Sequence, residues 1–557
     1  MKKLLPIVVW SLVIPLSLGG QDRLVLGGSV SGTANFFMAD SLIGADHTPQ
    51  YDHQLFGSEA WVSLNAAYKG FDGGIRFDMY NNSNLIDPKG SYSGQKIGRW
   101  FVRKSIKSLH LEAGYLYDQI GSGIIYRAYE ERSLAIDNAL YGIKVGYDFS
   151  DNWKLSAFTG RQKNLFDLYS TSLRGGSLTG FVSLDSAGRF AISPGIGIVG
   201  KTLSDATMDR IVAAINTYTP ADSVVPYYNT YALAFFNTLT AGPVTWYVEA
   251  AYKTPDAMFD PLAVKHNWTG KNSLGKIVVR PGHVLYTTLA FNTRGLGVTL
   301  EGKRTQDFNF RVDPFVTLNR GALNFLPPMA RSNTYTLTAY YAPATQEFGE
   351  QGAQLDIKYS PNRKLGFGLN LSHITDLKQV LLYQEVYADF FVKHKRKWKL
   401  TAGTQLLAYN LERYYNEPGA GMLHTVTPFV EYLYRITRRK SLRVEAQYMR
   451  VSPGKSGEPA HNGSWAYGLL EFNIAPHWSF SLSDMINVQP GEMVAVNPRT
   501  GKKEQLHYPR VDVFYTEGAT RLSLSYVKQV EGIVCTGGVC RLEPAFSGVK
   551  MTVNAAF

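Results

Sequence analysis

The chain has 557 residues, of which 18% are charged, and its formal net charge is +12. A basic chain can bind nucleic acid, but the basic residues are scattered and no nucleic-acid-binding motif is present, so no nucleic-acid partner is expected. The abundance of Tyr (34), Phe (29) and Gly (52) is typical of a large β protein, and no linker or shift in composition divides the chain.

Residues 1–20 have the layout of a cleaved secretory signal peptide. Lys2 and Lys3 precede an apolar stretch from Leu4 to Leu18, and small residues follow it. The alternative is an uncleaved membrane anchor, which is disfavoured because the stretch is shorter than a bilayer-spanning helix needs. No later stretch is long and apolar enough for a transmembrane helix.

Alternating segments recur from residue 21 to the C-terminus. The segment from Trp61 to Lys69 has one apolar and one polar face, because successive side chains in a strand point to opposite sides. Segments ending near Tyr117 and Tyr252 repeat this pattern. These strands are about 9–12 residues long, as tilted transmembrane strands are, and their apolar faces often end in the aromatic residues of a membrane girdle.

Short turns alternate with long loops between these strands, for example the expected loop Thr254–Gly282, which predicts an all-β, up-and-down, antiparallel transmembrane β-barrel. Counting inward from each end gives two consecutive strands of the same direction, at Lys303 and Thr334, so a further strand is expected in Asp313–Leu323. The total is about 26 strands (roughly 24–26), with short periplasmic turns and long external loops. Residues 21–557 are therefore predicted to be a single outer-membrane barrel domain without a separate plug domain.

The long loop Gly121–Gly142 is the most densely charged, and its isoleucines indicate that it folds into the lumen. One interpretation is a constriction or ligand site; the other, which we favour, is a loop anchored to the barrel wall by ion pairs. The candidate residues for the lumen or constriction are Arg127, Glu130, Glu131, Arg132 and Asp137.

Two clusters of basic residues, Lys393–Lys399 and Arg435–Lys440, fall at short turns. They could meet anionic lipid headgroups or a periplasmic partner, although solvated turns are the simpler interpretation.

Cys535 and Cys540 are the only cysteines, four residues apart in IVCTGGVC. An exported chain meets oxidising conditions, so a hairpin disulfide is expected. Two free thiols or a metal pair are the alternatives, but two ligands make a poor metal site.

The chain ends on an alternating strand, GVKMTVNAAF. Its apolar face, which includes Val553, Ala555 and Phe557, is expected to meet lipid, and the strand is expected to close the barrel against the segment Leu24–Ala39. A terminal aromatic residue on such a strand is similar to the assembly signal of bacterial outer-membrane barrels. A soluble edge strand is the alternative, which the repeated strands disfavour.

Three segments carry a resemblance: GSGIIYRAYEERSLAIDNALYG, YAPATQEFGEQ and VEGIVCTGGVCRLEPAFSGVKMTVNAAF. They resemble an exported outer-membrane barrel family of the Bacteroidota catalogued only as domain of unknown function 6029. The resemblance implies an outer-membrane setting and brings no activity, ligand or catalytic residue.

The sequence predicts a porin-like channel or transporter with a loop-constricted lumen, in the outer membrane of a Gram-negative envelope. The alternative is a non-enzymatic binding or scaffold component of a cell-surface or secretion assembly. No enzymatic motif occurs, so no catalytic residue, cofactor or metal site is expected. The expected partners are outer-membrane lipids, the barrel-assembly machinery, and an unknown solute or protein.

Overall fold

The computed structural model describes residues 23–557, apart from 187, 319, 416–418, 498–499 and 537–538, and it gives the backbone alone at the rest of 533–540. The signal peptide expected over residues 1–20 therefore lies outside the described residues. Within the described ranges, no helix is long and apolar enough to cross a membrane.

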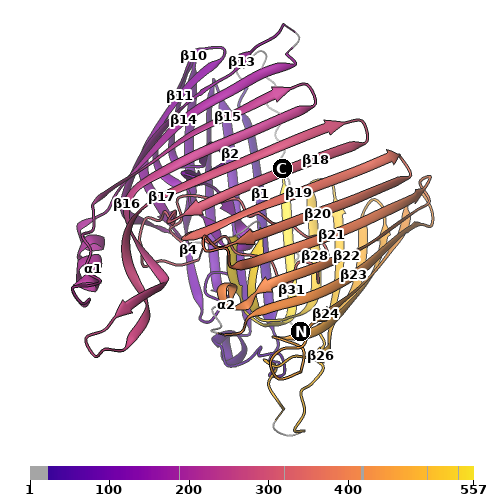
Figure 1. The fold of residues 1–557 in the computed structure, drawn as a ribbon. Helices are drawn as coiled ribbons and strands as arrows, with labels where there is room; N and C mark the ends of the chain where they lie inside the picture. The colour runs from indigo at the N-terminus through magenta and orange to yellow at the C-terminus, as the bar shows by residue number, and fades with distance from the viewer. Residues whose placement is uncertain (1–22, 187, 319, 416–418, 498–499, 537–538) are drawn as a thin grey trace, which may run out of the picture.

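The fold is a closed antiparallel β-barrel, which confirms the predicted class (Figure 1). The main sheet has 25 strands, of which β13 (Val182–Ser183) continues β12 after one intervening residue, so the wall is crossed 24 times. Each strand pairs with its neighbours along the chain, and the last strand pairs with the first. The alternating sequence permits this closure, because one face of every strand can meet the lumen while the other faces outward.

The 24 wall strands are β1 (Val25–Phe37), β2 (Phe56–Tyr68), β3 (Phe71–Ser83), β4 (Tyr92–Ile106), β5 (Leu109–Leu116), β10 (Leu140–Ser150), β11 (Trp153–Asn164), β12 (Asp167–Gly180), β14 (Phe190–Thr202), β15 (Asn229–Ala241), β16 (Val244–His266), β17 (Asn272–Thr293), β18 (Leu296–Gln306), β19 (Gly349–Asn362), β20 (Leu365–Thr375), β21 (Leu381–His394), β22 (Trp398–Asn410), β23 (Met422–Arg435), β24 (Lys440–Val451), β25 (Gly463–Ile474), β26 (Trp478–Pro490), β27 (Arg510–Glu517), β28 (Thr520–Gln529) and β31 (Phe546–Ala556). Shorter elements lie in the loops: η1 (Gln50–Gln54), β6 (Asp118–Ile120), β7 (Tyr126–Ala128), β8 (Glu130–Glu131), η2 (Arg132–Leu134), β9 (Ile136–Asp137), α1 (Asp205–Ile215), α2 (Leu411–Tyr414), β29 (Gly532–Thr536) and β30 (Val539–Glu543).

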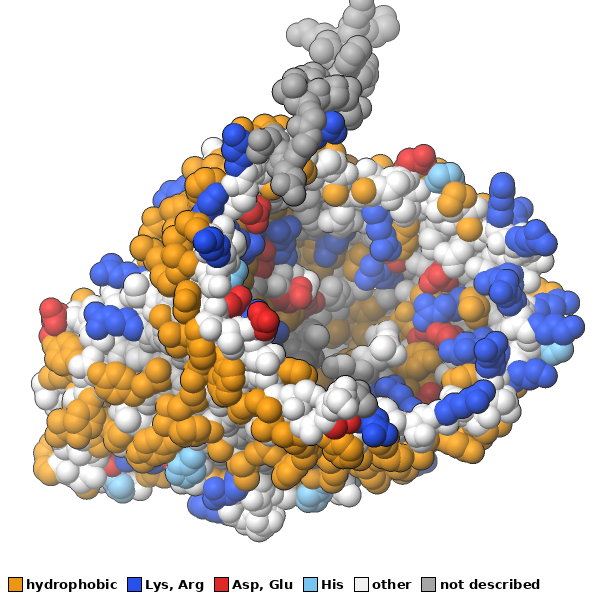
Figure 2. All heavy atoms as spheres, turned by 90° about the horizontal axis from the view of Figure 1, so that it is seen from above, with side chains coloured by type: hydrophobic (Ala, Val, Ile, Leu, Met, Phe, Trp, Pro, Cys, Tyr) orange, Lys and Arg blue, Asp and Glu red, His pale blue; other side chains and the backbone are white. Residues whose placement is uncertain are grey.

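The two ends of the barrel differ. Short connections lie at one end, called here the turn rim, which is uppermost in Figure 1, and long loops lie at the other, called the loop rim. Figure 2 looks onto the turn rim and shows a hollow centre and hydrophobic side chains over the outer wall. Outward residues such as Leu64, Phe235 and Leu285 are more than half exposed. A continuous apolar outer wall is expected of a barrel surrounded by lipid.

The predicted strands at Asp313–Leu323 and Thr334 are wrong, because β18 ends at Gln306 and β19 begins only at Gly349. Residues 307–348, called here the inner segment, lie inside the barrel (Figure 1). In the segment that begins at Thr334, Tyr335 and Leu337 alternate with threonines as in a strand, but both are buried among inward-facing wall residues. Burial of apolar side chains inside the lumen explains why a strand-like pattern forms no wall strand.

The expected loop Thr254–Gly282 is also wrong, because β16 and β17 continue through it as a hairpin that projects past the loop rim (Figure 1). Helix α1 packs against this projecting arm through Met208 and Ile211, in the same buried cluster as Ile277. The side chain of Ser204 accepts a hydrogen bond from the backbone N–H of Thr207, which caps the first turn of α1.

Candidate functional site

Buried lysines on the wall hold the beginning of the inner segment. Lys201 on β14 and Lys253 on β16 donate hydrogen bonds to the carbonyl oxygens of Arg311 and Asn309, each at 2.9 Å. Both lysines also reach Asp256, at 2.7 Å from Lys201 and 3.4 Å from Lys253. Because all three charged side chains are almost fully buried, each needs the others to offset the cost of its desolvation.

A third wall lysine holds the middle of the inner segment. Lys303 on β18 donates to the carbonyl oxygen of Pro327 and forms a 2.6 Å ion pair with Glu350 on β19. Lys303 and Glu350 are both buried. Since the lysines come from β14, β16 and β18, one sector of the barrel wall carries the inner segment.

The loop between β5 and β10 also occupies part of the lumen. Ile124, Ile125 and Tyr126 are at most 2% exposed and belong to the same buried cluster as Phe308 and Phe310 of the inner segment. The backbone N–H of Arg127 donates to the carbonyl oxygen of Leu323, at 2.9 Å. The loop and the inner segment therefore form one packed unit.

The predicted constriction residues have different surroundings. The guanidinium of Arg127 lies 4.4 Å from the ring centres of both Tyr129 and Phe325. Glu131 caps η2 by accepting hydrogen bonds from Ser133. These two residues serve the loop's own packing, and neither lines the cavities described below.

Glu130 and Asp137 meet basic residues of the wall. Arg76 on β3 donates to Glu130 at 2.6 Å and to Asp137 at 3.0 Å, and it also pairs with Asp78. Lys163 on β11 forms a second ion pair with Asp137. Burial alone would raise the pKa of Asp137, but Lys163 and Arg76 outweigh it and hold that pKa below its usual value. These contacts anchor the loop to the wall.

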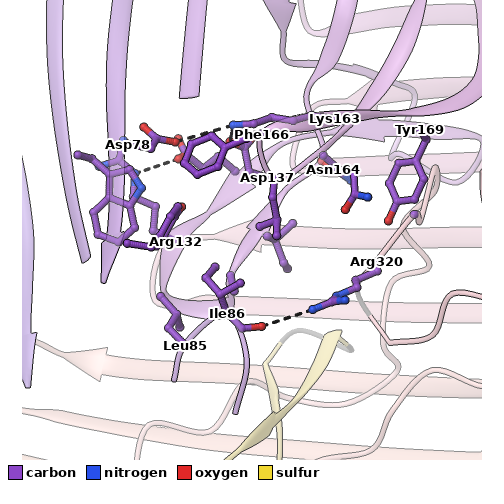
Figure 3. A pocket seen from close by; sticks show the side chains of 18 residues that line it. Asp78, Leu85, Ile86, Arg132, Asp137, Lys163, Asn164, Phe166, Tyr169 and Arg320 are labelled. Carbon is purple, nitrogen blue, oxygen red and sulfur yellow. Dashed lines mark hydrogen bonds and ion pairs between the residues drawn. The ribbon is translucent and has the colours of Figure 1, made fainter. Parts of the chain in front are cut away.

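This charged network borders a small cavity of about 100 Å³ (Figure 3). The side chains of Asp78, Asp137 and Lys163 lie together on one side of it, and Arg320 of the inner segment lies on another, donating to the carbonyl oxygen of Ile86 at 3.4 Å. The cavity therefore lies between the loop, the inner segment and the wall.

Two larger cavities are called here the wall cavities: one follows the inner faces of β1, β2 and β31, and the other lies among the loops beside them, with Phe37 of β1 among its lining residues. The first, of about 410 Å³, reaches from Phe546 near the loop rim to Asn554 near the turn rim. It shares Trp61, Leu85 and Arg132 with the small cavity of Figure 3. The second, of about 330 Å³, lies nearer the loop rim. Asn84 and Pro544 line both wall cavities, so the two adjoin.

Arg132 is the predicted constriction residue that reaches the wall cavities. Its guanidinium donates a hydrogen bond of 3.0 Å to the carboxylate of Glu130 and lies 5.3 Å from the ring centre of Trp61. From the wall, Glu59 and Lys550 face the same space. Among the described residues Lys550 has no ion-pair partner, and its ammonium lies 5.0 Å from the ring centre of Phe546.

Sequence reasoning did not show that Glu59 and Lys550 face the same cavity. Their inward parity was readable from the alternation, but their approach depends on the pairing of β1 with both β2 and β31. Within the described ranges, no cluster of three or more metal-ligating side chains occurs.

The other predicted residues lie away from this site. Val553, Ala555 and Phe557 are on the outward side of the closing strand, and the backbone of Phe557 exchanges hydrogen bonds of 2.8 and 3.0 Å with Gly28. Cys535 and Cys540 face each other across the β29–β30 hairpin, but their side chains lie outside the described part of the structure, so the disulfide stays a prediction. The two basic turns, 395–397 and 436–439, lie at the turn rim.

Comparison with known proteins places the chain in a family. A family of unknown function (DUF6029) matches residues 1–557, so the chain belongs to that family. This confirms the resemblance to an uncharacterised family, and it does not bear on the bacterial group. No curated protein matches the chain.

Several solved structures are similar in fold. The translocation pore of the P pilus usher PapC is 8% identical, with a TM-score of 0.41, over 96% of this chain and 99% of that chain. A mutant of the ferric enterobactin receptor PfeA of Pseudomonas aeruginosa is 9% identical, with a TM-score of 0.42, over 97% of this chain and 81% of that chain. The ferric-catecholate import receptor Fiu of E. coli K12 is 10% identical, with a TM-score of 0.38, over 97% and 82%. Such low identities and scores support no inference about the activity of this chain.

Proposed function

We propose that this member of the DUF6029 family is a porin-like channel of the outer membrane, through which small polar solutes pass along the wall cavities. The observation that carries the proposal is the adjoining of the two cavities beside β1, β2 and β31, from the loop rim to near the turn rim. Elsewhere the inner segment and the loop between β5 and β10 pack into buried hydrophobic clusters. Solute is therefore directed to one side of the lumen.

The chemistry of the wall cavities favours a charge-selective channel. Cations at Arg132, Arg541 and Lys550 face anions at Glu59 and Glu543. Arg541 is paired with Glu543, and Arg132 with Glu130. Lys550 is the cation of this group that lacks an ion pair within the described structure, so its charge is available to an anionic solute.

Reversing the charge of Lys550 is expected to reverse the preference of the channel. In planar bilayers with a KCl gradient, the wild type should prefer chloride and Lys550→Glu should prefer potassium, seen as a shift of the reversal potential. Lys358→Glu is the matched control, because Lys358 lies near the turn rim on β19, away from the wall cavities. An equal shift in both variants, or none in Lys550→Glu, would show that ions do not pass beside Lys550.

A second candidate function, a binding or scaffold role, is favoured by the projecting arm. The strands of the arm, β16 and β17, have 23 and 22 residues, so they continue well beyond the neighbouring strands β15 (13 residues) and β18 (11 residues). At its tip Trp268 is 74% exposed. If the arm binds a partner, removing residues 262–274, which include Trp268, should abolish that binding and leave the channel activity unchanged. A partner retained by the shortened protein would show that another surface binds it.

A further inference from the structure

The outer wall is hollowed over β11, β12, β14 and β15. The hollow has a volume of about 650 Å³. Its floor is made of small outward residues, Ala157, Gly176 and Gly200, and its sides are apolar. The side residues are Leu155, Leu178, Ile196, Ile198, Tyr231 and Leu233. This set of residues is called here the outer groove.

The outer groove lies on the lipid side of the wall. Phe158, Leu173 and Val199 have the opposite parity on β11, β12 and β14, and all three are buried in the lumen with the inner segment. Because side chains alternate along a strand, the residues between them point outward. Ile198, for example, is 48% exposed.

Two arginines stand at the loop-rim end of the outer groove. Arg174 lines the groove and pairs across the ladder with Thr159, while Arg161 pairs with Ser172, so the two arginines are diagonal neighbours on the outer face. Both side chains are exposed. Neither has an ion-pair partner or a side-chain hydrogen bond among the described residues.

The arginines mark the edge of the apolar band. Toward the turn rim the outward positions are Leu178 and Leu155, whereas toward the loop rim they are polar, at Ser172 and Thr202. Arg174 and Leu178 are four residues apart on β12, which corresponds to about 13 Å along the strand. A charged end and an apolar groove that runs from it into the membrane match the shape and polarity of a lipid.

We propose that the outer groove binds one molecule of a phosphorylated glycolipid of the lipid A type, with a phosphate on Arg161 and Arg174 and an acyl chain along the groove. The proposal rests on the proposed outer-membrane placement, in which the loop rim faces the outer leaflet where such glycolipids reside. Paired guanidinium groups bind phosphate through several charge-assisted hydrogen bonds. An unpaired cation at the edge of a bilayer needs such a counter-charge, because burial without one is costly. The small residues on the floor leave room for a chain that a flat apolar wall would not hold.

The test is native mass spectrometry of the full-length barrel in detergent micelles, titrated with bisphosphorylated lipid A, with dephosphorylated lipid A, and with phosphatidylglycerol. We expect one molecule of lipid A to bind, and about tenfold weaker binding for each arginine removed in Arg161→Gln and Arg174→Gln. Dephosphorylated lipid A should bind the wild type about as weakly as lipid A binds the double variant. Binding of phosphatidylglycerol as tight as that of lipid A would overturn the assignment to lipid A.

Two further variants separate the groove from general attraction to charge. Gly200→Val should weaken binding because its side chain fills the groove. The wall can accommodate the added Cβ, whose only close neighbour is the ring of Tyr231, at 3.2 Å. Arg304→Gln is the control, because Arg304 is an outward arginine near the loop-rim end of β18 that does not line the outer groove. Equal binding by wild type and Gly200→Val, or a loss in Arg304→Gln equal to that in Arg174→Gln, would overturn the proposal.

The outcome is independent of the channel activity. Conductance in phosphatidylcholine bilayers should be the same for the wild type and for the Arg161→Gln, Arg174→Gln double variant, because neither arginine faces the lumen. Loss of lipid binding with normal conductance would therefore concern the outer groove alone, and loss of conductance in Lys550→Glu would concern the lumen alone.

Discussion

Asp256→Asn is expected to lower the free energy of unfolding by about 3–5 kcal/mol, because it leaves two buried lysines without their shared anion. Asp256 accepts from Lys201 at 2.7 and 2.8 Å and from Thr230 at 3.0 Å, and Lys253 lies 3.4 Å away. Both lysines also hold the inner segment, so the variant should loosen its attachment to β14 and β16. Urea unfolding of the reconstituted barrel, followed by its mobility on unheated gels, measures the change.

Asp72→Asn is the matched control for this variant. Asp72 forms a 3.7 Å pair with Arg103 in which both side chains are more than 40% exposed. Exposed pairs of this kind contribute less than about 1 kcal/mol. If Asp256→Asn unfolds at the same urea concentration as Asp72→Asn, the buried lysines do not depend on Asp256.

Acidification is expected to destabilise the barrel through His461. Burial lowers the pKa of His461 to about 4 from its ordinary value of 6.5. The unfolded chain therefore takes up a proton below pH 6.5 while the folded chain stays neutral until about pH 4. The contribution of His461 to the free energy of unfolding is highest above pH 6.5 and falls by about 1.4 kcal/mol for each pH unit between these two values.

His461→Asn removes this part of the pH dependence without straining the loop. His461 has φ of 52°, in the left-handed region that asparagine tolerates well. The imidazole Nδ1 lies 3.1 Å from the hydroxyl oxygen of Tyr341 in the inner segment, and an asparagine side chain can also hydrogen-bond there. Urea unfolding at pH 7, 6 and 5 should show a shallower slope for His461→Asn than for the wild type. Parallel slopes would mean that His461 is not the titrating group.

The barrel wall could be predicted from the sequence because the signal is local. A strand with one face in lipid and one in the lumen must alternate, as the segment Trp61–Lys69 does. The observed 24 strands lie at the lower end of the predicted range, because Asp313–Leu323 and the alternating segment from Thr334 were each counted as a strand although both belong to the inner segment. Sequence alone does not show whether the apolar side of such a segment faces lipid or fills the lumen.

The projecting arm was missed because of its prolines. Pro255 and Pro261 lie within β16, and prolines usually exclude a strand interior. Both fall at register shifts, between Lys253 and Asp256 and between Asp260 and Val264, where the ladder lacks a regular bond. A β-bulge therefore reconciles the prolines with a continuous strand.

The site could be predicted only in part. The loop Gly121–Gly142 was found from its mixture of charges and isoleucines, and Arg132 from that loop does reach the wall cavities. The partnership of Asp256 with Lys201 and Lys253 could not be found. Asp256 follows the first bulge of β16, and a bulge changes the side to which the following residues point.

The most direct test of the proposed path is the access of a thiol reagent to single cysteines, measured as single-channel conductance in a Cys535→Ser, Cys540→Ser background. Thr33→Cys places a thiol in the first wall cavity, and Ser372→Cys places one on the inward face of β20, where Ser372 is 3% exposed. A charged methanethiosulfonate reagent should reduce the conductance of Thr33→Cys and leave Ser372→Cys unchanged. The opposite result, a reduction in Ser372→Cys with none in Thr33→Cys, would contradict a path along β1, β2 and β31.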